Sequence, residues 1–161
     1  MALTLRSKNF KNGDLLPNEQ VINGMGYSGD NRSPHLSWDG APAGTRSFAI
    51  TMYDPDAPTG SGWWHWVVAN IPSNVHEFPE GAGNTGSVLP AGVLQTITDF
   101  GVSGYNGAGT PKRQSHRYIF TIHALSVDKL DIKENSSGAA VGAAIYYTSL
   151  GSATLTTHFG S

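Results

Sequence analysis

Hydrophobic and polar positions alternate along several segments of the chain. The alternation is clearest over residues 46–53 and over residues 117–125. Residues 64–71 are apolar at nearly every position, which is typical of a strand covered on both faces. An alternation with a period of two indicates a β-strand, and so does a short run of apolar residues. We therefore predict strands over all three segments. Weaker patterns predict further strands over residues 2–7, 92–98 and 153–159.

One helix is predicted near the C-terminal end of the chain. Residues 135–137 (Asn-Ser-Ser) offer side-chain oxygens that can cap a helix, and Val141 and Ile145, four positions apart, would face a core. The helix is expected to end before Gly151. Turn-rich stretches lie over residues 23–33, 79–87 and 101–111. Together these patterns predict a mainly β, antiparallel domain with long loops and one short helix.

Composition narrows the classes of protein that remain. A chain of 161 residues without an internal repeat or linker is expected to form one domain, residues 1–161. Its net charge of −2 predicts no basic face for nucleic acid, and the absence of cysteine excludes disulfides and thiol catalysis. No stretch approaches the ~20 apolar residues of a transmembrane segment, and no secretory signal is evident. We therefore expect a cytoplasmic location.

Two carboxylates follow the strand predicted over residues 46–53. Asp54 and Asp56 are each followed closely by a proline, Pro55 and Pro58. Proline fixes φ and removes a backbone donor, so this segment is expected to turn rather than to continue as a strand. Two neighbouring carboxylates suit general acid–base chemistry or a cation, although solvated acids on a turn would look the same.

Two polar clusters, residues 53–68 and residues 111–118, each hold one histidine. His65 lies in an apolar strand, where an aspartate turned toward one ring nitrogen would leave the other nitrogen for a ligand. His116 opens the third strand among the cations Lys112, Arg113 and Arg117, an environment that suits a phosphate or carboxylate. We interpret His116 as a ligand-binding residue. Lys112 and Arg117 are interpreted as surface cations, with Arg117 paired to one of the aspartates.

The same residues leave two other kinds of site open. His65, His116, Asp54 and Asp56 could form a zinc or iron site, although no His-x-His or His-x-x-x-His spacing supports it. A hydrolase could use an aspartate and a histidine as acid and base, with or without a metal. No Gly-x-Ser-x-Gly nucleophile motif is present, which favours binding over catalysis.

With both clusters in view, the chain resembles the phosphatidylethanolamine-binding protein family, in its bacterial and archaeal Raf-kinase-inhibitor-like branch. The family's Asp-Pro-Asp-Ala-Pro turn and His-Trp strand match residues 54–58 and 65–66. Its glycine- and proline-rich loop ending in His-Arg-Tyr matches residues 107–112 and 116–118, with Thr110 where many relatives carry a first proline. Further matches cover residues 31–38 and 42–47, within a resemblance that runs from about residue 8 to residue 159.

The resemblance implies a large antiparallel sheet packed with a smaller one and a pocket at one end. It implies that phosphate or phosphoethanolamine-type head groups are bound there without catalysis, and that Asp56 pairs with Arg117. The implied ligand-binding residues are Asp54, His65, Pro111, His116 and Tyr118, and the implied pocket walls are Asp56, Ala57, Pro58 and Trp63.

The resulting prediction is a non-enzymatic binding protein for a small phosphorylated or anionic ligand, without a cofactor or metal. The alternative is a hydrolase that uses an Asp/His or metal site in the same pocket. The family name adds a further expectation, a regulator that inhibits a kinase or another enzyme through a protein partner. A homodimer is also compatible with the sequence.

Overall fold

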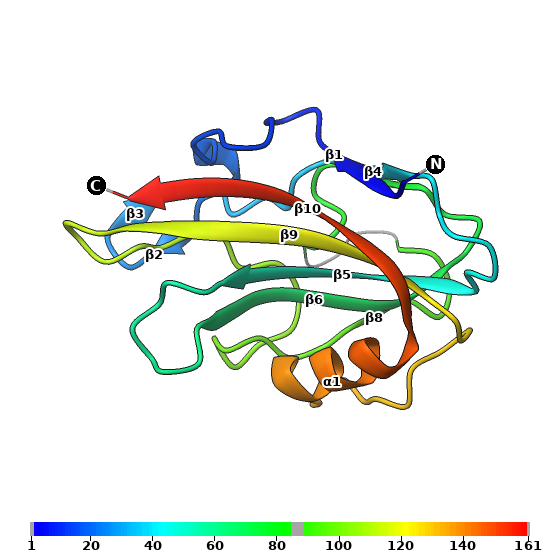
Figure 1. Cartoon of the computed structure of the whole chain (residues 1–161). Coiled ribbons are helices and arrows are strands. Elements are labelled where there is room, and N and C mark those ends of the chain that lie inside the picture. The colour runs from blue at the N-terminus through cyan, green and yellow to red at the C-terminus, as the bar shows by residue number, and fades with distance from the viewer. Residues whose placement is uncertain (1, 85–88, 161) are drawn as a thin grey trace.

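The chain is built around a five-stranded antiparallel sheet with the strand order β10-β9-β5-β6-β8 (Figure 1). The computed structural model describes residues 2–84 and 89–160. The strands of this sheet are β5 (Ser47–Asp54), β6 (Trp63–Pro72), β8 (Leu94–Gln95), β9 (Ser115–Leu125) and β10 (Ser149–Gly160). The three strongest sequence patterns thus form β5, β6 and β9, the middle of the sheet.

A smaller antiparallel sheet has the order β1-β4-β7. Its strands are β1 (Thr4–Arg6), β4 (Leu36–Asp39) and β7 (Glu77–Phe78). A two-stranded hairpin, β2 (Asn23–Gly24) with β3 (Tyr27–Ser28), and a 3₁₀ turn at Asn18–Gln20 complete the described elements, with α1 (Gly138–Thr148). The predicted fold class, a mainly β protein with a large and a small antiparallel sheet and one helix near the C-terminus, is confirmed.

Both faces of the central sheet are buried, as the apolar pattern of its strands predicts. On one face, Phe48 and Ile50 of β5 pack with Trp38 of the smaller sheet in the main core. On the other face, Ala49 and Val67 pack in a second core under α1. Figure 1 shows α1 on one side of the sheet and β1 and β4 on the opposite side. The alternation of β5 therefore assigns neighbouring residues to two different cores.

Helix α1 forms where the capping pattern predicts it. Ser137 is the N-cap, and its Oγ accepts a hydrogen bond from the backbone N–H of Ala140 at 3.1 Å. Val141 and Ile145 are buried against the sheet. The helix ends at Thr148 because β10 begins at the next residue and pairs with β9 along nearly its whole length.

The weaker strand predictions were right in position but not in extent. Residues 92–98 form a strand only over Leu94–Gln95, and residues 2–7 only over Thr4–Arg6. Four short strands, β2, β3, β4 and β7, were not predicted, since strands of two to four residues carry too few positions to show a period. The end of the predicted turn over residues 79–87 falls outside the described residues. Within the described part of the chain, no helix is long and apolar enough to cross a membrane.

Candidate functional site

The antiparallel register brings three chemistry-bearing segments to one end of the large sheet. β5 ends at Asp54, which pairs with Trp63 at the start of β6, and Tyr53 pairs with Ile119 near the start of β9. Neighbouring antiparallel strands run in opposite directions, so the end of β5 and the beginnings of β6 and β9 lie at the same edge. The two polar clusters that are far apart in the sequence therefore meet there.

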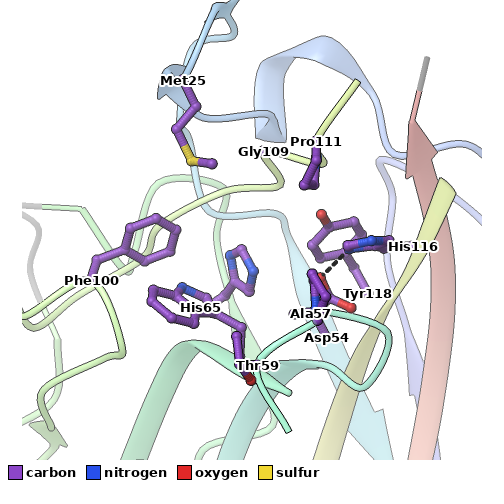
Figure 2. A pocket seen from close by; sticks show the side chains of 12 residues that line it. Met25, Asp54, Ala57, Thr59, His65, Phe100, Gly109, Pro111, His116 and Tyr118 are labelled. Atoms are coloured by element: carbon purple, nitrogen blue, oxygen red, sulfur yellow. Dashed lines mark hydrogen bonds and ion pairs between the residues drawn. The ribbon is translucent and has the colours of Figure 1, made fainter. Parts of the chain in front are cut away.

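A cavity of about 330 Å³ lies at this edge (Figure 2). All five residues predicted to bind a ligand line it: Asp54, His65, Pro111, His116 and Tyr118. The lining also includes three of the four predicted walls, Ala57, Pro58 and Trp63, together with Met25, Thr59, Phe100 and Gly109. The structure thus places a carboxylate, two imidazoles and a phenol in a cavity whose other walls are largely apolar.

Asp54 and His116 form a buried pair at one side of the cavity. Oδ2 of Asp54 lies 2.7 Å from Nδ1 of His116, and the two residues are 2% and 4% exposed (Figure 2). Oδ1 of Asp54 accepts the backbone N–H of Asp56 at 2.8 Å, which closes the proline turn on the carboxylate. At the other side of the ring, Nε2 of His116 lies 2.7 Å from Oε1 of Gln114. The His116 ring is thus held between the Asp54 carboxylate at Nδ1 and the Gln114 amide at Nε2.

His65 is held in a different way. Its Nδ1 donates to the backbone carbonyls of Asn106 at 2.8 Å and Gly107 at 3.1 Å. Its ring lies between Phe100 and Tyr118, with centroid distances of 5.2 and 5.1 Å. Burial lowers the pKa of His65 below 6.5. The hypothesis that an aspartate orients His65 is therefore wrong: two carbonyls orient it, and the aspartate orients the other histidine.

Asp56 does not line the cavity, and its prediction as a wall residue needs correction. Its carboxylate is turned outward to Arg117, from which it accepts the backbone N–H at 2.8 Å, Nε–H at 3.0 Å and Nη2–H at 2.8 Å. The side-chain hydrogen bond from Arg117 lowers the pKa of Asp56 from 3.8 to about 2. This confirms the pair that the family resemblance implied. The pair ties the proline turn to β9, and so supports the wall residues without touching the cavity.

The phenol of Tyr118 is also fixed by the surrounding backbone. Oγ1 of Thr110 donates to the carbonyl of Phe159 at 2.9 Å and lies 2.6 Å from the hydroxyl of Tyr118. The threonine proton is committed to the carbonyl, so the phenol donates to the threonine oxygen. Burial raises the pKa of Tyr118 well above 10. Thr110 therefore connects the loop that precedes β9 to both β9 and β10.

Phe100 reaches the cavity because its loop is fastened to β6. Oδ2 of Asp99 accepts the backbone N–H of Trp64 at 2.7 Å, and the N–H of Asp99 donates back to the carbonyl of Trp64 at 3.1 Å. Phe100 then packs edge-on against Trp63, with centroids 5.5 Å apart. Phe100 and Met25 were not predicted as cavity residues, because their contacts join loops that are distant in the chain. No local motif marks them.

The structure does not assemble the proposed two-His, two-carboxylate metal set. His65 turns its Nδ1 to backbone carbonyls, and Asp56 turns its carboxylate to Arg117. Among residues 2–84 and 89–160, no three His, Cys, Asp or Glu side chains gather in an arrangement that could hold a metal ion.

The sequence profile of the phosphatidylethanolamine-binding protein family matches residues 6–160. The chain therefore belongs to the phosphatidylethanolamine-binding protein family. Its relatives include the Escherichia coli UPF0098 protein YbhB, 55% identical over 157 residues that cover 98% of this chain and 99% of YbhB.

Solved structures of relatives support the same assignment. The crystal structure of Escherichia coli YbcL, described as a new member of the mammalian PEBP family, matches with a TM-score of 0.97 at 44% identity, over 100% of this chain and 99% of the crystallised chain. A phosphatidylethanolamine-binding protein homologue from Chlamydia trachomatis matches with a TM-score of 0.82 at 26% identity, over 99% of this chain and 98% of that protein. The recognised family and the fold are thus confirmed from both sequence and structure.

Proposed function

We propose that this protein is a non-enzymatic binding protein whose cavity takes a small phosphorylated or anionic ligand of the phosphate or phosphoethanolamine type. One observation carries the proposal: the buried Asp54–His116 pair and the unpaired side of the His65 ring face the same cavity. Membership of the phosphatidylethanolamine-binding protein family supports the same class of ligand.

The size and chemistry of the cavity favour a head group. Small-molecule sites commonly measure ~300–1,000 Å³, and a volume of about 330 Å³ is at the lower end of that range. With a proton on Nε2, His116 would donate to a phosphoryl oxygen once the exposed Gln114 side chain swings aside. The aromatic rings of Trp63 and Phe100, together with the carboxylate of Asp54, would attract an ammonium group. A phosphoethanolamine head group carries both charges at a short separation.

The hydrogen bonds of the histidines favour binding over hydrolysis. Neither histidine of the cavity is hydrogen-bonded to a hydroxyl group of a described residue: His116 contacts Asp54 and Gln114, and His65 contacts two backbone carbonyls. Within the described residues, the hydrogen bond between a hydroxyl and an imidazole joins Thr51 and His123, which do not line the cavity. The cavity therefore lacks, among these residues, the hydroxyl–imidazole contact that would activate a nucleophile.

Calorimetric titration of metal-free protein with O-phosphoethanolamine and with inorganic phosphate tests the proposal. We expect saturable binding by the wild type and a loss of roughly 10–100-fold in His116→Ala, the worth of a charged hydrogen bond of ~1.5–3 kcal/mol. Gln114→Ala is the matched variant two positions away. It removes the internal competitor for Nε2 and should bind as tightly as the wild type, or up to ~10-fold more tightly.

Circular dichroism of each variant checks that the fold is retained. Equal affinity in the wild type and in His116→Ala would contradict the proposed site. Release of inorganic phosphate from a panel of phosphoesters, at a rate above the uncatalysed one, would favour the hydrolase alternative.

A further inference from the structure

One nitrogen in the cavity is a hydrogen-bond acceptor without a donor. Nδ1 of His65 faces two carbonyl oxygens, which can only accept, so Nδ1 carries the ring proton. In the neutral ring, Nε2 then bears a lone pair. Nε2 makes no hydrogen bond to any of residues 2–84 or 89–160, and His65 is only 3% exposed. The fully buried side-chain atoms without a partner in the described residues are Oε1 of Gln20 and Oγ1 of Thr96, so Nε2 of His65 is open to the cavity, where a ligand can donate a hydrogen bond to it.

The surroundings of His65 favour the neutral ring. The charged and titratable groups that face it are Asp54 at the end of β5, Asp99 in the loop after β8, and His116 and Tyr118 on β9. The two aspartates favour a charged ring, but burial outweighs them and lowers the pKa of His65. Protonating Nε2 to receive an anion is therefore costly in this cavity.

We propose that the cavity selects the singly protonated, monoanionic form of a phosphoryl group, whose own P–O–H donates to Nε2 of His65. This inference rests on the proposed function and specifies the ligand form that the site accepts. A phosphoryl oxygen without a proton accepts from Nε2–H of His116, and the protonated oxygen satisfies His65. A fully deprotonated phosphate would instead set an oxygen lone pair against the lone pair of Nε2.

A pair of matched ligands separates this inference from the proposed function. O-phosphoethanolamine and O-sulfoethanolamine have the same ammonium arm and the same tetrahedral shape. The sulfate ester carries no ionisable proton near neutral pH, whereas a phosphate monoester has its second pKa at about 6. We expect calorimetry at pH 6 to give at least tenfold tighter binding of the phosphate ester. Its affinity should then fall about tenfold per pH unit above the second pKa.

Titration of the wild type distinguishes a failure of this inference from a failure of the proposed function. Equal affinity for the two esters, or phosphate-ester affinity that does not fall between pH 6.5 and 8.5, would overturn this inference and leave the proposed function standing. Failure of both esters to bind would overturn the two together.

The variant His65→Gln tests which residue makes the discrimination. Its amide can present either a donor or an acceptor, so the two esters should bind within about threefold of each other. A preference retained at tenfold or more would overturn the assignment to His65. If the variant does not fold, ¹⁵N NMR of the wild-type histidine rings at pH 7 decides instead: an unprotonated Nε2 in His65 is expected, and a protonated Nε2 would refute the inference.

Discussion

Replacing Asp56 by asparagine should destabilise the protein in a pH-dependent way, because Asp56 ties the proline turn to β9. In the folded protein its carboxylate accepts three hydrogen bonds from Arg117, and its pKa falls from 3.8 to about 2. Asparagine keeps the size and one oxygen acceptor but removes the charge. The perturbation is thus nearly isosteric, and it removes the charge together with one of the two oxygens that accept from Arg117.

The pKa of Asp56 sets the size and the direction of the effect. A drop of 1.8 units, from 3.8 to about 2, corresponds to roughly 2.4 kcal/mol. The side chains of Asp56 and Arg117 are 31% and 57% exposed, so solvent screening reduces the expected loss to about 1 kcal/mol. Since the folded pKa is the lower one, this stabilisation is present above about pH 4 and is lost as the pH falls toward 2. About half of it should be lost by pH 3.

Urea denaturation of the wild type and Asp56→Asn at pH 7, 5, 4 and 3 measures this contribution. The difference in the free energy of unfolding should be about 1 kcal/mol at pH 7 and should shrink below pH 4. Asp128→Asn is the matched control, since Asp128 also pairs with an arginine, Arg46, but is 68% exposed. A pH-independent difference for Asp56→Asn, or an equally large loss in Asp128→Asn, would refute the argument.

Two further predictions concern stability. Burial lowers the pKa of His123 from 6.5 to about 4. Between these two pH values the unfolded chain binds a proton at His123 that the folded protein does not bind, so the folded protein loses stability as the pH falls. When the pH falls from 6.5 to 4, the free energy of unfolding measured in urea should decrease by up to ~3 kcal/mol more in the wild type than in His123→Gln. Equal decreases in the two proteins would contradict this prediction. A Cβ at Gly138 would overlap the Trp64 ring, so Gly138→Ala should cost ~1–3 kcal/mol. Gly142→Ala in the same helix meets that ring at an ordinary 3.9 Å and should stabilise by ~0.5–1 kcal/mol; thermal melts that rank the two alanine variants the other way round would refute the packing argument.

The sequence alone was sufficient wherever the controlling interaction is local. The alternation over residues 46–53 and 117–125 predicted β5 and β9, because every second side chain of a strand meets the same core. Ser137 was recognisable as a helix cap since its partner lies three residues away. The proline after Asp54 marked the turn that ends β5, because proline cannot continue the pairing of a central strand.

Only the tertiary structure decided which residues of the site are hydrogen-bonded to one another. Sequence offered two aspartates and two histidines without showing that Asp54 pairs with His116, 62 positions away, or that backbone carbonyls 41 and 42 positions away orient His65. Those contacts depend on strand register and on how loops close, and neither leaves a local periodic signal. Phe100 lines the cavity for the same reason, since a long-range loop contact places it there. The residue types defined what chemistry the cavity could hold, and the long-range pairing of strands and loops decided which nitrogen was left open for a ligand.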